Sequence, residues 1–242
     1  MKKIISFVLL VFIMGCSDSD SAQNGDIGQG GSLAVFAIKG NYLYGVDQMK
    51  LNVFSLINSE KPVKVNEIPI GFDIETLFSY GDNLFIGSRN GMFIYSISNP
   101  ENPTKLSSVQ HFTACDPVIA NSTHSYVTLN SNTTCGNNTN VLQVYDTKDL
   151  TNPKLIHSRT LSQPKGISFY TADYLLVCDD VIKIFNIQNP AEPVLVHAID
   201  KNCFDLIVRD NTLFAIGNKG VYRYKMNPND IKDIQLESET TF

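Results

Sequence analysis

The sequence predicts an all-β fold, namely a five-bladed β-propeller made of four-stranded antiparallel blades. The apolar segments are rich in aromatic and β-branched residues, which favour strands over helices. A unit of similar length recurs five times, and each copy holds short apolar segments separated by turn residues. Repeats of roughly 40 residues with four strands are typical of propeller blades. One such sheet cannot bury both faces alone, so neighbouring sheets must cover each other.

An aromatic residue marks the same place in the third strand of every unit. These residues are Phe54, Tyr95, Tyr145, Phe185 and Tyr224. The intervals between them are 41, 50, 40 and 39 residues. The long interval contains an Asn-rich insertion around residues 130–140, so the repeat itself keeps a nearly constant length.

Turn residues after the aromatic fix the register of the units. A proline follows eight residues later in four units, at Pro62, Pro103, Pro153 and Pro193. The residue at offset four is Asn58, Asn99, Asp149 or Asn189. In the fifth unit Lys232 replaces the proline, but Asn227 and Pro228 keep the turn chemistry. Such residues preset the backbone for tight turns and so end one strand and direct the next.

The repeats divide the chain into blades at about residues 32–70, 71–111, 112–162, 163–200 and 201–242. In the second blade we expect strands at 75–80, 84–88, 92–97 and 104–109, and in the fourth at 166–170, 174–178, 181–187 and 194–199. The first strand of the propeller is expected at 33–38 and the last near 233–238. The alternative is an all-β sandwich or an open array of sheets.

The sequence leaves the closure of the ring open, because no spare strand is available to join the first and last blades. Closure can rest on packing between blades, on a swapped terminal strand, or on blades from a second chain that complete a larger ring.

The N-terminus has the pattern of an export signal. Lys2 and Lys3 precede an apolar run from Ile4 to Met14, which is too short to span a membrane and fits a signal-peptide core. The run ends in Ile-Met-Gly-Cys, which resembles the lipobox of bacterial lipoproteins, although Met14 is bulkier than the usual residue. We therefore expect residues 1–15 to be a signal peptide and Cys16 to be lipidated. An ordinary secretory signal with a chance cysteine is the alternative.

Residues 16–31 form the expected lipidated and flexible tether, since they are rich in Ser, Asp and Gly. The acidic run after Cys16 is similar to the surface-export signals of some outer-membrane lipoproteins, and a solvated linker explains it equally well. The expected location is the cell envelope. More specifically, we expect anchoring in the outer membrane, with exposure at the cell surface as a further hypothesis.

The units also resemble LVIVD-type repeats, which occur in β-propeller surface lipoproteins. The resemblance covers about residues 32–230 and is closest at 115–118, 126–129 and 142–146. The repeat's Asp is kept only at Asp146; Ser55, Ser96, Asn186 and Lys225 replace it elsewhere. The resemblance therefore supports the fold and implies no established activity.

The net charge of −5 and the lack of a basic stripe argue against nucleic acid as a partner. The expected partners are the membrane, through lipid on Cys16, and an unknown surface protein or glycan. No sequence pattern for a cofactor is present, and none is expected.

Four cysteines remain after Cys16. In a meander blade, the start of strand one and the loop between strands two and three lie at the same end, which would gather all four there. In an oxidising compartment disulfides are plausible. We favour Cys115–Cys135, which would hold the Asn-rich insertion, and Cys178–Cys203, which would tie adjacent blades. Buried free thiols are the alternative, and the spacing does not suit a zinc site.

The same end of the propeller should carry the candidate binding residues. These are Asp73, Asp116, Lys165, Asp179, Asp180 and Asp205, together with Asn132 and Asn137 of the insertion. Paired carboxylates there would suit glycoside cleavage or Ca²⁺ binding. The simpler interpretation is that these Asp residues cap turns, and no metal-binding motif is present.

Three functions follow as hypotheses. The first is a non-catalytic binding or scaffold module at the cell surface, whose loops make the contacts. The second is a carbohydrate hydrolase that uses carboxylates at the channel mouth, which requires Asp73, Asp116 or Asp205 to converge on one pocket. The third is a structural subunit of a larger surface assembly. No catalytic residue is assigned from the sequence.

Overall fold

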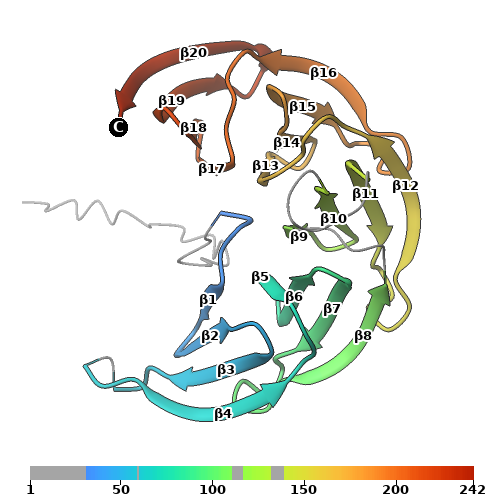
Figure 1. Ribbon diagram of the computed structural model, residues 1–242, viewed down its shortest axis with the longest axis vertical. Helices are drawn as coiled ribbons and strands as arrows, with labels where there is room; N and C mark the ends of the chain where they lie inside the picture. The colour runs from blue at the N-terminus through green and yellow to red at the C-terminus, as the bar shows by residue number, and fades with distance from the viewer. Residues whose placement is uncertain (1–30, 59, 111–116, 132–138) are drawn as a thin grey trace, which may run out of the picture.

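All regular structure in the described residues is β-strand. The computed structural model describes residues 31–58, 60–110, 117–131 and 139–242. They form twenty strands in five four-stranded antiparallel sheets, each built from four consecutive strands. The sheets are arranged around a common centre as blades of a propeller (Figure 1). The described part of the chain contains no helix that is long and apolar enough to cross a membrane.

The strands follow the chain outward from the centre in every blade. Blade 1 holds β1 (Phe36–Lys39), β2 (Tyr42–Val46), β3 (Lys50–Ser55) and β4 (Val63–Pro69). Blade 2 holds β5 (Ile74–Tyr80), β6 (Asn83–Ser88), β7 (Gly91–Ser96) and β8 (Thr104–Gln110). Blade 3 holds β9 (Val118–Ala120), β10 (His124–Leu129), β11 (Val141–Asp146) and β12 (Lys154–Thr160). Blade 4 holds β13 (Ile167–Tyr170), β14 (Tyr174–Cys178), β15 (Ile182–Asn186) and β16 (Val194–Ile199). Blade 5 holds β17 (Asp205–Arg209), β18 (Thr212–Gly217), β19 (Gly220–Asn227) and β20 (Asp230–Thr241).

These bounds confirm the predicted strands of blades 2 and 4 to within one or two residues. The first strand begins later than predicted, because Ser32 and Leu33 form a turn in which the Ala34 amide donates to the Gly31 carbonyl at 3.0 Å. The last strand is longer than predicted, since β20 pairs with β19 as far as Thr241.

The repeated aromatic residue lies beside an irregularity that all five blades share. The register between the third and fourth strands shifts immediately before Phe54, Tyr95, Tyr145, Phe185 and Tyr224. Such a bulge bends the outer strand and increases its twist. The repeat therefore encodes the curvature of each blade as well as its length.

Blades 2, 3 and 4 each pack one face against the preceding blade and the other against the following blade, whereas in the part of the chain that the structure describes blades 1 and 5 each have one neighbouring blade. We call these two faces the leading face and the trailing face. Ala37, Tyr44 and Val53 of the blade 1 trailing face share a buried cluster with Leu77, Leu84 and Tyr95 of the blade 2 leading face. The innermost strands pack in sequence, β1 against β5, β5 against β9, β9 against β13 and β13 against β17. This packing between sheets forms the core.

The arc of blades does not close between blade 5 and blade 1 (Figure 1). In the described residues β17 and β1 lack the packing that joins the other innermost strands. Instead Ser32 reaches across the centre, where its hydroxyl accepts from the Ile167 amide at 2.8 Å and donates to the Asp205 carboxylate at 3.4 Å. Among the strands that the structure describes, none is exchanged between blades 1 and 5, because all four strands of each come from its own repeat.

Candidate functional site

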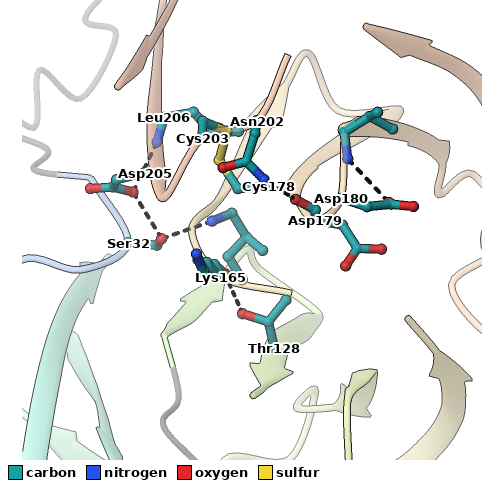
Figure 2. Close-up of a disulfide and its surroundings, with 12 residues drawn as sticks. Ser32, Thr128, Lys165, Cys178, Asp179, Asp180, Asn202, Cys203, Asp205 and Leu206 are labelled. Atoms are coloured by element: carbon teal, nitrogen blue, oxygen red, sulfur yellow. Dashed lines mark hydrogen bonds between the residues drawn. A yellow bond between two sulfur atoms is a disulfide. The ribbon is translucent and has the colours of Figure 1, made fainter. Parts of the chain in front are cut away.

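The predicted end of the propeller contains a disulfide between Cys178 and Cys203 (Figure 2). Its Cα atoms are 5.5 Å apart, and it joins the end of β14 to the segment before β17. The predicted tie between blades 4 and 5 is therefore confirmed. Cys115 and Cys135 lie outside the described residues, so their pairing stays a prediction.

The carboxylate of Asp179 is buried and serves the structure of blade 4. It accepts hydrogen bonds from the backbone amides of Ser162, at 3.0 Å, and Gln163, and Lys183 Nζ lies 2.6 Å away. Lys183 also lies 2.8 Å from Asp180, and this side-chain hydrogen bond lowers the pKa of the Asp180 carboxyl. Both carboxylates are thus occupied by neighbours in their own chain.

Lys165 and Asp205 also hold loops in place at this end (Figure 2). The Lys165 carbonyl accepts from the Thr128 hydroxyl at 2.6 Å, which links blade 4 to blade 3. Asp205 accepts from the Leu206 amide at 2.9 Å and from Ser32. Burial raises the pKa of the Asp205 carboxyl, because a charge is disfavoured where water is excluded.

Asp73 has a left-handed backbone with φ of 56°, and its carbonyl accepts from the Arg89 amide at 3.0 Å. Asp116, Asn132 and Asn137 lie outside the described residues. A recess of about 310 Å³ opens at this end between blades 4 and 5, and Asp180 is the predicted residue that lines it. Within the described ranges, no three His, Cys, Asp or Glu side chains are placed to hold a metal ion.

A larger recess lies at the opposite end, between blades 3 and 4. Its volume is about 510 Å³, within the range of about 300–1,000 Å³ found for small-molecule sites. The turns between the first and second strands of both blades contribute most of its polar groups. The lining residues are Tyr80, Ala120, Asn121, Ser122, Thr123, His124, Tyr126, Phe169, Thr171, Ala172, Asp173, Ile187, Gln188 and Pro190.

Two substitutions in the repeat distinguish this junction from the one between blades 1 and 2. Between blades 1 and 2, the hydroxyl of Tyr42 donates to Glu101 at 3.0 Å and bridges the corresponding turns. The strand pairing places His124 at the position of Tyr42, and Ala191 follows its Asn-Pro pair as Glu101 follows its own. Ala191 has no side-chain acceptor, so the bridge seen between blades 1 and 2 is missing between blades 3 and 4.

The hydroxyl of Tyr126 differs from its counterpart in blade 1. Tyr44 occupies the same position, and its hydroxyl donates to the Pro100 carbonyl of the next blade at 3.0 Å. Tyr126 is 0% exposed, and its hydroxyl has no hydrogen-bond partner among the described residues. Its ring packs edge-on against Phe169, with centroids 5.4 Å apart. A buried polar group without a partner costs about 1–3 kcal/mol and calls for an explanation.

The recess carries little charge. Its lining includes one carboxylate, Asp173, and no Lys or Arg. His124 is nearly buried, and its Nδ1 lies 2.8 Å from the Thr123 hydroxyl. Burial lowers the pKa of His124, which favours the neutral ring. The remaining polar groups are uncharged hydroxyls and amides, which suit binding rather than acid–base chemistry.

Sequence reasoning directed attention to the other end and missed this recess. Residues 171–173 fall between the predicted strands 166–170 and 174–178, and no motif marks the site. The available signal was the comparison of repeats, in which Tyr44 and Tyr126 share a position whereas Tyr42 and Glu101 are replaced by His124 and Ala191.

Comparisons with known proteins identify the fold and nothing finer. No family model matches the sequence, and no curated protein matches it. Solved structures do match. A protein from Lactobacillus plantarum is 8% identical with a TM-score of 0.73, covering 86% of this chain and 71% of that chain.

Two further structures extend this result. The computationally designed Ika8 protein is 10% identical with a TM-score of 0.62, and the N-terminal domain of Nup159 is 14% identical with a TM-score of 0.54. Each alignment covers 86% of this chain, and this chain spans 61% of the length of each of those chains. The neighbours support the β-propeller fold, and at such low identity they carry no functional assignment.

Proposed function

We propose that this protein is a lipid-anchored, non-catalytic binding module of the bacterial cell envelope. The observation that carries the binding role is the 510 Å³ recess, which is lined by aromatic rings and uncharged hydrogen-bonding groups. Sites of this composition recognise ligands by shape and hydrogen bonding. The resemblance of the units to LVIVD-type repeats of surface lipoproteins agrees with this role.

The anchoring half of the proposal rests on the N-terminal sequence. A short apolar run ends at Gly15-Cys16, and a polar tether follows it. Several acyl chains on Cys16 would give durable anchoring, because each buried methylene contributes about 0.8 kcal/mol. We further propose that the anchor lies in the outer membrane and that the propeller is exposed at the cell surface.

Metabolic labelling with a fatty acid tests the anchor. We expect the chain to incorporate label and to sediment with membranes, and the Cys16→Ser variant to do neither. Labelling that persists in Cys16→Ser would place the lipid elsewhere and overturn this half of the proposal. A binding screen of the purified full chain against envelope glycans and peptides tests the other half.

The hydrolase hypothesis is less well supported by the described residues. Asp179 and Asp205 are engaged by backbone amides, and Asp205 and Asp73 do not line the recesses described above. A role as a structural subunit has one observation in its favour, which is that blades 1 and 5 both expose apolar side chains at the open end of the arc.

A further inference from the structure

We propose that the recess between blades 3 and 4 binds a neutral, polyhydroxylated ligand of the carbohydrate class, with the Tyr126 hydroxyl as a direct contact. This inference deepens the proposed binding function and rests on it. It follows from three features of the recess, namely an unsatisfied buried hydroxyl, an aromatic lining and the scarcity of charge.

The Tyr126 hydroxyl defines what the ligand must offer. Burial raises the pKa of Tyr126 to about 12, so the group keeps its proton and can donate. In blade 1 the matching hydroxyl donates to a carbonyl of its own chain. Tyr126 has no such partner in the described residues, and it lines the recess. A ligand oxygen that accepts this hydrogen bond would remove the cost of the unpaired donor.

The aromatic side chains favour a ligand with an apolar face. Tyr80 is partly exposed at one side of the recess, and Phe169 lines it next to Tyr126. Aromatic rings bury large apolar areas at low conformational cost. A sugar ring presents C–H groups on its faces and hydroxyls around its rim, which matches rings flanked by Ser, Thr, Asn and Gln.

The charges exclude other classes of small ligand. An anionic ligand would meet Asp173 and no Lys or Arg in the lining. A cation would meet one carboxylate, whereas buried charges require several partners. A peptide would find no free strand edge in the lining, because hairpin turns form most of the wall; strand addition needs such an edge. A neutral polyol can form hydrogen bonds with the polar lining residues without burying an unpaired charge and without needing a strand edge.

The test uses the purified full chain in a detergent without a sugar headgroup. Neutral oligosaccharides and uncharged peptides are screened by saturation-transfer NMR, and affinities of hits are measured by calorimetry. We expect a neutral oligosaccharide to bind. Tyr126→Phe should weaken it about tenfold, the equivalent of one lost hydrogen bond of about 1.4 kcal/mol, and Tyr80→Ala should also weaken it.

A matched variant separates binding from folding. Tyr44→Phe removes a hydroxyl that is hydrogen-bonded in the free chain, so it should lower the melting temperature and leave the affinity unchanged. Tyr126→Phe removes an unpartnered hydroxyl, so the melting temperature should stay the same or rise while the affinity falls. A structural role for Tyr126 would instead lower both.

The outcomes distinguish this inference from the proposed function. If only peptides bind and Tyr126→Phe weakens them, the ligand class is wrong and the binding function stands. If an oligosaccharide binds with the same affinity to wild type, Tyr126→Phe and Tyr80→Ala, the binding function stands and the recess is the wrong site. If neither library binds, both proposals fail.

Discussion

The same position in the repeat can have a different environment in each blade. Positions whose environment differs between blades are candidates for function. Tyr44 and Tyr126 share a strand position, yet one hydroxyl donates to Pro100 and the other has no partner in the described residues. From the sequence alone, both tyrosines are predicted to have the same structural role. The distinction depends on how the neighbouring blade is placed, because Pro190 occupies the sequence position of Pro100 and yet its carbonyl does not accept from Tyr126.

The same limit applies to the predicted binding residues. The repeat correctly places Asp179 and Asp205 near the disulfide, at the end that was expected (Figure 2). It does not reveal that backbone amides of Ser162, Gln163 and Leu206 occupy these carboxylates. Which backbone groups need a partner depends on loop conformation, and residue spacing does not encode it.

Asp205 provides a prediction with a defined pH dependence. Its folded pKa is raised by burial, so the folded chain binds the proton more tightly than the unfolded chain does. The native state therefore loses stability as the pH rises from the unfolded pKa of about 3.9 through the folded value. The Asp205→Asn variant has no carboxyl group to titrate, so it should not lose stability in this way. The Asn side-chain oxygen can still accept the hydrogen bond from the Leu206 amide.

We expect the melting temperature of Asp205→Asn to exceed that of the wild type at pH 7, with a difference that shrinks towards pH 4. Thermal unfolding monitored by circular dichroism at both pH values measures this difference. An equal difference at pH 4 and pH 7 would show that the Asp205 charge is not the cause. Asp210→Asn, on the exposed turn that follows β17, serves as the control.

At the scale of elements, strand order and blade boundaries follow from the sequence because the turn chemistry is local. Asn99 and Pro103, or Asn189 and Pro193, fix a turn whatever surrounds it. The ends of the fold are less predictable. Ser32 enters a turn instead of β1 because its hydroxyl meets the Ile167 amide of a distant blade, and no local pattern reports that contact.

The Cys178–Cys203 disulfide gives the prediction at this scale. It closes a loop with a sequence separation of 25 and joins blade 4 to blade 5. The chain-entropy model assigns about 3 kcal/mol to a loop of this length. A Cys178→Ala, Cys203→Ala double variant should lose about that much unfolding free energy in urea titrations.

The remaining cysteines supply the comparison. A Cys115→Ala, Cys135→Ala variant keeps the bond between Cys178 and Cys203, so dithiothreitol should still lower its melting temperature. In the Cys178→Ala, Cys203→Ala variant, dithiothreitol should lower the melting temperature less than it does in the wild type, because this bond is absent. A response to reductant that is the same in wild type and in that variant would contradict a stabilising role for the bond.

At the scale of the whole molecule, both free ends of the arc expose apolar side chains, and the end at blade 5 also carries an ion pair. The trailing face of blade 5 has Arg223 where blades 1 to 4 have Val53, Ile94, Val144 and Ile184, and Arg223 pairs with Glu237 at 3.1 Å. Terminal repeats need a polar outer face for solubility, but this face also exposes Ile207 and Phe214 and is only partly polar. The leading face of blade 1 exposes Phe36, Ile38 and, in part, Phe54.

The position of Phe36 allows a direct test of whether the leading face of blade 1 is uncovered. Phe36 is 53% exposed, whereas its equivalent Leu77 in blade 2 is 2% exposed because blade 1 covers it. Leu77→Ala should cost about 2–5 kcal/mol through lost burial and a cavity. Phe36→Ala should cost at most about 1 kcal/mol, since no neighbouring sheet covers it. Urea denaturation of both variants measures the difference, and equal costs would mean that a blade covers Phe36 in solution.

The exposed leading face also predicts how the chain behaves at high concentration. Contiguous apolar patches promote association, so the mass of the purified chain from light scattering should rise with concentration. Phe36→Asp should restore the monomer mass, because a charge on this face opposes its burial in any contact. Ile57→Asp places the same charge at an exposed apolar residue outside the regular strands of blade 1 and should leave the association unchanged. If both variants remain associated, contacts elsewhere on the propeller must hold the copies together, and the leading face of blade 1 is then not the contact surface.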